Sequence, residues 1–199
     1  MNGQCPQLSP SPGDALVIVD VQNDFLPGGR LAVPGGDQVI PPLNACILRF
    51  SRARLPVIAT RDWHPRDHTS FQAQGGPWPA HCVAGTSGAW FPEALALPPD
   101  AWIVSKGTRI DDPGYSAFSG TDLADRLRRA GVRNLFVGGL ATDYCVLNTV
   151  RDALAAGFQV YLLEDAVRAV EVRPGDGQRA LEAMEQAGAE RLCSDRISP

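Results

Sequence analysis

The chain has 199 residues, enough for one domain with a full core, and a formal net charge of −4 without any run of Lys and Arg. This composition argues against a surface for nucleic acids or anionic membranes. No apolar run is long enough to span a bilayer, which takes about 20 residues, and the N-terminus lacks the regions of a signal peptide. We expect one domain over residues 14–199, preceded by a flexible N-terminal tail of residues 1–13.

The predicted elements alternate between short apolar runs and stretches of helical periodicity. The runs predict strands, in chain order, at residues 15–19, 56–60, 101–105, 134–137, 159–163 and 190–193. Helices are predicted near residues 37–54, 121–130, 142–156 and 176–187. Such alternation predicts a three-layer α/β/α sandwich of Rossmann-like type, with a mostly parallel sheet of about six strands. Residues 65–92 form a long loop rich in Pro and Gly, which is usually functional.

The cysteines are odd in number, scattered, and without CxxC spacing; they are Cys5, Cys46, Cys82, Cys145 and Cys193. This pattern favours neither a disulfide scaffold nor a structural zinc knuckle. A reducing cytoplasm is the simplest setting, and we expect a cytoplasmic protein.

Chemically complementary side chains follow four separate predicted strands. In parallel sheets, ligands bind outside the carboxyl ends of the strands. Each residue alone has an ordinary explanation, such as a turn aspartate or a solvated lysine. Their coincidence at one edge of the sheet predicts a functional site; they are Asp20, Asp62, His64, Lys106 and Cys145.

Cys145 is the candidate nucleophile. It is expected in the first turn of a helix begun by Thr142 and Asp143, where the positive helix end favours a thiolate and backbone amides can hold an oxyanion. The amides of Ala141 and Cys145 are candidates for that oxyanion hole. A buried structural cysteine is the alternative.

A thiol needs a base or cation nearby to become a useful nucleophile. Asp20 is the candidate for accepting the Cys145 proton and later delivering it to a leaving amine. Lys106 is the candidate for keeping both groups suitably charged and oriented.

A second group of residues suggests a metal site. Asp62 and His64 lie on the same side of an extended segment, and His81 arrives from the long loop. Two imidazoles and one carboxylate leave positions open for water or substrate, and they suit zinc, manganese or iron(II). His68 is an additional candidate ligand. Capping and loop hydrogen bonding are the alternative roles.

Three aromatic residues lie near the loops over this edge: Phe25, Trp78 and Tyr115. They are candidates for sandwiching a flat heteroaromatic ring. Ordinary loop packing is the alternative for each of them. Tyr115 differs from the other two in following an insertion-like segment at residues 109–114.

With these residues assembled, the chain closely resembles the nicotinamidases of the isochorismatase-like cysteine hydrolases. The matching motifs occur in the family's order: residues 20–25 (DVQNDF), 62–65 (DWHP), 78–82 (WPAHC), 106–107 (KG) and 139–146 (GLATDYCV). The resemblance implies hydrolysis of nicotinamide to nicotinate and ammonia within NAD salvage. Hydrolysis of pyrazinamide is expected as well.

The resemblance also implies roles for particular residues. The family's aspartate–lysine–cysteine triad falls on Asp20, Lys106 and Cys145. Its divalent metal, with zinc favoured over manganese or iron, falls on Asp62, His64 and His81. The ring pocket falls on Phe25, Trp78, Tyr115 and Leu140, and the bond between Leu140 and Ala141 is expected to be cis.

Other functions remain open at this stage. A related small-amide hydrolase would use the same triad, although the predicted metal ligands disfavour it. A nicotinamide or metal sensor would not need the nucleophile, and a thiol redox protein would want a second cysteine near Cys145. The sequence leaves the oligomeric state open, a homo-oligomer included.

Overall fold

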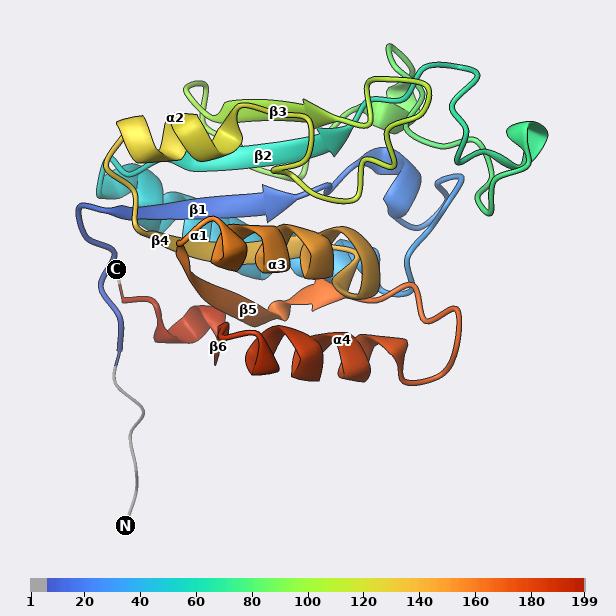
Figure 1. Cartoon of the computed structure of the whole chain (residues 1–199). Coiled ribbons are helices and arrows are strands. Elements are labelled where there is room, and N and C mark those ends of the chain that lie inside the picture. Colours follow the sequence, from blue (N-terminus) through green and yellow to red (C-terminus); the bar gives the residue numbers. More distant parts are fainter. Residues whose placement is uncertain (1–6, 199) are drawn as a thin grey trace.

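The computed structural model describes residues 7–198. At its centre is an all-parallel, six-stranded sheet in the order β3-β2-β1-β4-β5-β6 (Figure 1). The strands are β1 Asp14–Val19, β2 Val57–Asp62, β3 Trp102–Lys106, β4 Asn134–Leu140, β5 Gln159–Arg168 and β6 Glu190–Leu192. The chain forms β1 in the middle of the sheet, adds β2 and β3 on one side, and then adds β4, β5 and β6 on the other. The strand order therefore reverses between β1 and β4, where α/β proteins place their ligands.

Helices cover both faces of the sheet, which confirms the expected α/β fold class. The helices are α1 Ile40–Arg52, α2 Leu123–Arg129, α3 Leu147–Ala155 and α4 Asp176–Gln186. Figure 1 shows α2, α3 and α4 in front of the sheet and α1 behind it. The long connections gather at one end, beyond the tips of the strand arrows.

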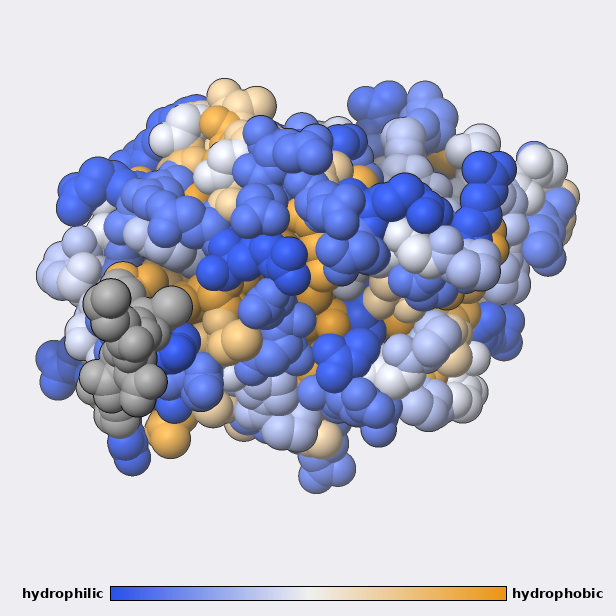
Figure 2. Space-filling model, turned by 90° about the horizontal axis from the view of Figure 1, so that it is seen from below, coloured by the Kyte–Doolittle hydropathy of each residue, from blue (hydrophilic) through white to orange (hydrophobic). Residues whose placement is uncertain are grey.

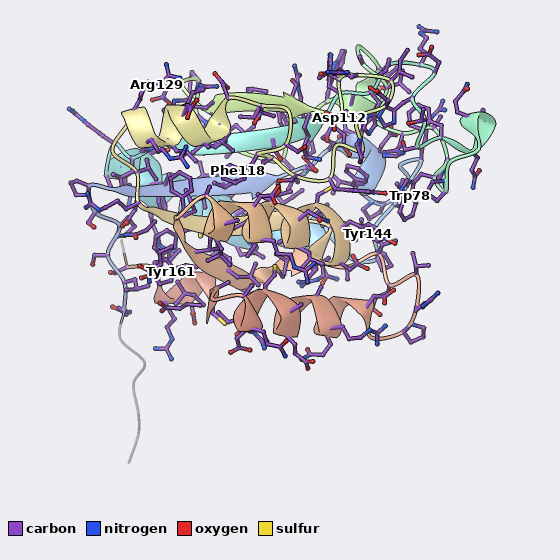
Figure 3. All side chains as sticks on the ribbon, viewed as in Figure 1. Trp78, Asp112, Phe118, Arg129, Tyr144 and Tyr161 are labelled. Atoms are coloured by element: carbon purple, nitrogen blue, oxygen red, sulfur yellow. The ribbon has the colours of Figure 1, made fainter. Side chains whose placement is uncertain are left out.

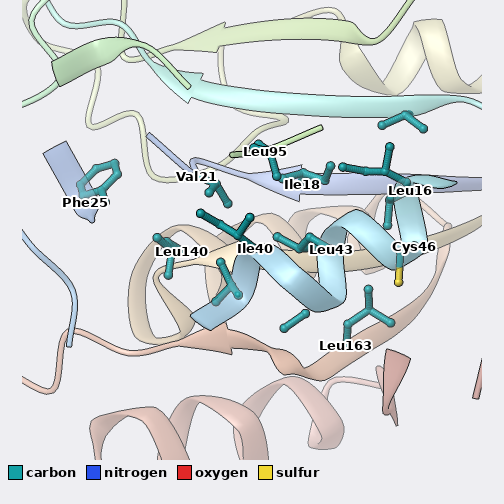
Figure 4. Packing of buried hydrophobic residues seen from close by; sticks show 14 of the residues in the cluster. Leu16, Ile18, Val21, Phe25, Ile40, Leu43, Cys46, Leu95, Leu140 and Leu163 are labelled. Carbon is teal, nitrogen blue, oxygen red and sulfur yellow. The ribbon is translucent and has the colours of Figure 1, made fainter. Parts of the chain in front are cut away.

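Strand β1 is buried on both faces because its side chains alternate between two cores. Leu16 and Ile18 pack in the core on the α1 side, with Leu43 and Cys46 of that helix (Figure 4). The alternate residues Ala15, Val17 and Val19 pack in the other core, with buried residues of the front helices. The continuous apolar run at residues 15–19 thus reflects burial from both sides.

The connection from β4 to α3 differs from the expected regular helix start. Residues Thr142–Val146 form a π-helical turn, and α3 begins only at Leu147. Asp143 does not cap this turn. Its carboxylate instead accepts hydrogen bonds from the amides of Val170 and Glu171, in the loop after β5. The expectation that Asp143 satisfies helix amides is wrong, because these loop amides take up both of its oxygens.

The expected tail, residues 1–13, lies partly outside the described residues. Within its described part, Leu8 forms a parallel bridge with Ile197, near the other end of the chain. Cys46, Cys82, Cys145 and Cys193 are free thiols, and Cys5 lies outside the described residues. Among residues 7–198, no helix combines the length and apolar character needed to cross a bilayer. The face in Figure 2 is largely hydrophilic, with hydrophobic residues visible between the polar ones.

Candidate functional site

A cavity lies beyond the carboxyl ends of the central strands and contains most of the predicted site residues. Figure 3 shows Trp78 and Tyr144 at this end of the molecule, with Tyr161 at the opposite end. The cavity is lined by Phe25, Leu31, Val33, Asp62, His64, Ser70, Trp78, His81, Pro113, Tyr115, Ala141, Tyr144, Cys145 and Val170. Asp20 and Lys106 do not line it, but they are buried beside Cys145.

Lys106 lies at the centre of a buried cluster of charges. Its Nζ lies 2.6 Å from Asp20 Oδ2 and 2.6 Å from Asp62 Oδ1. It also donates to the carbonyl of Gly114 and lies 3.4 Å from Cys145 Sγ. Lys106 donates hydrogen bonds to Asp62, Gly114 and Cys145, and its contact with Asp20 is a close ion pair. Lys106 thus holds two carboxylates and the thiol in one cluster.

Asp20 is arranged as a proton acceptor. It follows β1 directly and has a left-handed backbone, with φ of 49°. Thr60 donates from its hydroxyl to Asp20 Oδ1 at 2.7 Å, which fixes one oxygen. The other oxygen, Oδ2, is buried and receives no hydrogen bond within the described residues. The thiol of Cys145 is within hydrogen-bonding reach of this carboxylate.

Burial of this cluster favours a protonated Cys145 thiol at rest. Burial raises the pKa of Cys145 well above its ordinary value, and Lys106 opposes this only in part. Burial likewise raises the pKa of Asp20 against the charge of Lys106. The helix start, which is expected to favour a thiolate, is thus opposed by burial and by two nearby carboxylates. A proton passing from Cys145 to Asp20 would leave the net charge of the cluster unchanged.

Asp62 connects this cluster to two histidines. Its Oδ1 faces Lys106, whereas its Oδ2 lies 3.6 Å from His64 Nε2 and 3.9 Å from His81 Nε2. Burial would raise the pKa of Asp62, but the charge of Lys106 holds it below its usual range. The carboxylate therefore stays ionised.

The two histidines present their Nε2 atoms toward Asp62. His64 Nδ1 lies 2.9 Å from the carbonyl of Gly107, and His81 Nδ1 lies 2.8 Å from the carbonyl of Pro79. A carbonyl can only accept, so Nδ1 carries a proton in each ring, and in the neutral imidazole the lone pair is on the Nε2 that faces Asp62. Metal-binding histidines are oriented by such outer contacts. The three ligand atoms lie within 4.8 Å of one another, which fits one divalent ion.

His68 lies next to this group, but its ring nitrogens are engaged elsewhere. Its ring stacks on that of His64 at a centroid distance of 4.1 Å. Nδ1 lies 2.7 Å from Ser70 Oγ, and Nε2 lies 2.8 Å from the carbonyl of Asp112. The prediction of His68 as a further ligand does not fit this geometry, because a ring bound on both sides has no lone pair left for a metal.

The predicted aromatic residues all line the cavity, together with one that the sequence analysis missed. Trp78 donates from Nε1 to the hydroxyl of Tyr115 at 2.9 Å. Tyr144 lies edge-on to Trp78, at a centroid distance of 5.0 Å, and tilted against Tyr115. Its position directly before Cys145 in the motif is a signal that could have identified it. Val170 also lines the cavity, and no local pattern marked it.

Leu140 differs from the expectation of a ring contact. Its side chain is 1% exposed and packs in the core on the α1 side, near Ile40 and Leu43 (Figure 4). It is absent from the cavity lining because it follows the alternation of β4 into the core. The bond from Leu140 to Ala141 is cis, as expected.

The end of β4 requires glycine for a close backbone approach. At Gly139, φ is 124°, and a Cβ there would lie 2.1 Å from the carbonyl oxygen of Val19. Any larger residue would push β4 away from β1. Gly139 therefore lets Ala141 and Cys145 lie at the cavity beside Asp20.

Comparisons with known proteins agree with this geometry. Residues 14–196 match the isochorismatase domain. The chain is 38% identical to a nicotinamidase of Acinetobacter baylyi, over 92% of this chain and 94% of that protein. It is also 38% identical to the nicotinamidase/pyrazinamidase of Mycobacterium tuberculosis, over 90% and 98% of the two chains.

Two solved structures are similar over nearly the whole chain. The pyrazinamidase of Pyrococcus horikoshii in complex with zinc has a TM-score of 0.88 and 50% identity, covering 92% of this chain and 99% of that one. PnC1 from L. infantum in complex with nicotinate has a TM-score of 0.90 and 37% identity, covering 98% and 99%. These matches confirm the family resemblance read from the motifs.

Proposed function

The chain belongs to the isochorismatase family and is an amidohydrolase, and from this premise we propose that it hydrolyses nicotinamide to nicotinate and ammonia. One observation carries the proposal: an aromatic-lined cavity joins a thiol with a buried acid–lysine pair to a two-histidine, one-carboxylate group. The first set suits attack on a carboxamide, and the second suits a ligand with a basic ring nitrogen. Nicotinamide has both groups on one small ring.

The proposed reaction begins with proton transfer from Cys145 to Asp20. The thiolate attacks the carboxamide carbon, and the amides of Ala141 and Cys145 hold the oxyanion. The carbon–nitrogen bond then breaks, and ammonia leaves with the proton from Asp20. Asp20 next removes a proton from water, and the resulting hydroxide attacks the thioester and releases nicotinic acid, which loses its own proton to solvent, together with the Cys145 thiolate. The Asp20 proton returns to the thiolate, so each group ends as it began.

Lys106 serves this sequence as a fixed positive charge. Burial would lower its pKa, but the charges of Asp20 and Asp62 raise it well above its ordinary value, so it stays protonated throughout. Its Nζ contacts the base and the nucleophile together, at 2.6 Å and 3.4 Å. The negative charge that moves between Asp20 and Cys145 therefore stays next to the same cation.

We propose that Asp62, His64 and His81 hold one divalent ion, with zinc favoured over manganese or iron. Zinc accepts carboxylate and imidazole ligands with bonds of about 2 Å, and the unprotonated Nε2 atoms and ionised carboxylate match that preference. When bound, such an ion is a Lewis acid that can accept the ring nitrogen of the substrate. All three residues line the cavity that Cys145 also lines, so a bound ion would lie beside the nucleophile.

Several further expectations belong to this proposal. Pyrazinamide is a second substrate, because it combines a similar flat ring with the same carboxamide. The reaction belongs to NAD salvage, and the four described free cysteines favour a cytoplasmic location. A homo-oligomer remains a prediction.

Ammonia release from purified protein tests the proposal. We expect release from nicotinamide and pyrazinamide, loss of release after complete chelation, and recovery on adding zinc. A non-aromatic carbamoyl amide should be hydrolysed poorly, because it offers no ring nitrogen. Preference for that amide over nicotinamide would instead assign the chain to the related small-amide hydrolases.

A further inference from the structure

One wall of the cavity comes from the loop between β5 and α4, through Val170. Asp143 holds this loop with both oxygens of its carboxylate. Oδ1 accepts a hydrogen bond from the amide of Val170 at 2.9 Å, and Oδ2 accepts one from the amide of Glu171 at 3.0 Å. Glu171 has a left-handed backbone, with φ of 58°. The carboxylate thus bridges two consecutive amides at a point where the chain turns.

Asp143 also belongs to the turn that carries the nucleophile. It lies two residues before Cys145 and directly before Tyr144, and both of these line the cavity. A single side chain therefore ties the segment with the nucleophile to the facing wall at Val170. Hydrogen bonds to an ionised carboxylate are stronger than those between neutral groups.

In the part of the chain that the structure describes, two further carboxylates make hydrogen bonds only within this loop and the start of α4. Glu171 accepts from the amides of Gly175 and Gly177, and Asp176 accepts from the amide of Arg173. Among the side-chain hydrogen bonds of residues 7–198, those of Asp143 are the ones that join the loop to the nucleophile's turn. Asp176, the first residue of α4, is thus a matched control at the end of the same loop.

The position of the wall matters because the cavity is narrow. Only about 30 Å³ of free space is left between its lining side chains. A small displacement of Val170 is then enough to change how closely a ring is enclosed.

We propose that Asp143 is a positioning residue, which sets the distance between the nucleophile's turn and the Val170 wall and thereby determines how tightly the aromatic ring binds. This inference rests on the proposed nicotinamidase function. Asp143 itself is not required to touch the substrate or to transfer a proton. Its loss should therefore weaken ring binding more than it slows the chemical steps.

The test measures nicotinamide binding by calorimetry in zinc-loaded protein carrying Cys145→Ala, so that no turnover occurs. Adding Asp143→Ala should weaken binding on the order of tenfold, the equivalent of one charge-assisted hydrogen bond. Asp143→Asn should recover part of this loss, since its amide oxygen can still accept from Val170. Asp176→Ala should bind like the parent. In the active protein, Asp143→Ala should raise KM on the order of tenfold and change kcat by less than about threefold.

Equal binding by the Asp143→Ala and Asp176→Ala proteins would overturn the inference, as would a fall in kcat at unchanged KM. If Asp143→Ala fails to fold by circular dichroism, Asp143→Asn decides: binding and KM identical to the parent would also overturn it. Absence of ammonia release from nicotinamide by the parent enzyme is a different result, because it removes the proposed function first.

Discussion

Lys106 Nζ lies 2.6 Å from Asp62 Oδ1, and this contact joins the nucleophile's cluster to the two histidines. The other oxygen of Asp62 faces His64 and His81. One carboxylate therefore belongs to both parts of the proposed site. Oδ1 of Asp62 contacts Lys106 and Oδ2 faces the histidines, and substitutions can separate the effects of these two contacts.

Asp62→Asn and His81→Asn should differ in how they respond to added metal. Each should weaken metal binding by at least about tenfold, measured by the metal retained after dialysis. At saturating zinc, His81→Asn should regain much of its activity. Asp62→Asn should stay on the order of 100-fold slower, because Lys106 has lost a buried partner. Full recovery of Asp62→Asn by zinc would show that its contact with Lys106 is unimportant.

Lys106 is the only lysine in the sequence, and it is 1% exposed. An amine-reactive ester should therefore modify the folded protein at its α-amino group alone and leave activity unchanged. In urea, Lys106 should react as well, because unfolding exposes it and removes the carboxylates that raise its pKa. Peptide mapping by mass spectrometry gives both results. Modification of Lys106 in folded, active protein would contradict its burial.

The Trp78–Tyr115 hydrogen bond spans two loops at the cavity. Tyr115→Phe removes the acceptor for Trp78 Nε1, at a cost of about 1 kcal/mol, so we expect KM for nicotinamide to rise about fivefold. Tyr144→Phe is the control, because the Tyr144 hydroxyl makes no hydrogen bond within the described chain. Steady-state kinetics should separate the two variants; equal KM values would show that the bond does not shape the pocket.

Stability should fall between pH 9 and about 11. Burial raises the pKa of Cys46 from 9.0 to about 11, partly opposed by Arg49. The folded state keeps a proton that the unfolded state releases, so the stabilisation is complete below pH 9 and is lost as the pH rises toward 11. The loss for this thiol is on the order of 3 kcal/mol.

Urea unfolding at several pH values measures this effect. Cys46→Ala should lower stability at pH 8, because it leaves a small cavity, but should also flatten the alkaline decline. Buried Cys82 keeps part of the decline in the variant, because burial raises its pKa as well. If the stability of Cys46→Ala declined with pH as steeply as that of the parent, the attribution of this decline to the Cys46 thiol would be wrong.

The parts of this protein that could be predicted from sequence are those with a local pattern. The apolar run at residues 15–19 predicts a strand that is buried on both faces. Asp20 follows it directly and therefore lies at the edge where parallel sheets bind ligands. Cys145 follows a strand and two glycines in the same way. These predictions need no knowledge of distant partners.

The rest depends on contacts between segments far apart in the chain. Asp143 looks like a helix cap, yet its partners lie in the loop after β5, 27 and 28 residues away. His68 has the spacing of a ligand, but Ser70 and the carbonyl of Asp112 occupy its ring. The resting protonation of Cys145 depends on burial and on two carboxylates from other strands. The residues next to each of these side chains in the sequence do not predict these contacts.

The central claim is that Cys145 attacks the carboxamide of nicotinamide, and steady-state ammonia release by the Cys145→Ala protein tests it most directly. Cys46→Ala is the matched control, since it removes a buried thiol from the opposite core. We predict that zinc-loaded Cys145→Ala binds nicotinamide but releases no ammonia above the buffer rate, whereas Cys46→Ala stays active. Ammonia release by Cys145→Ala at the rate of the unaltered protein would contradict the account.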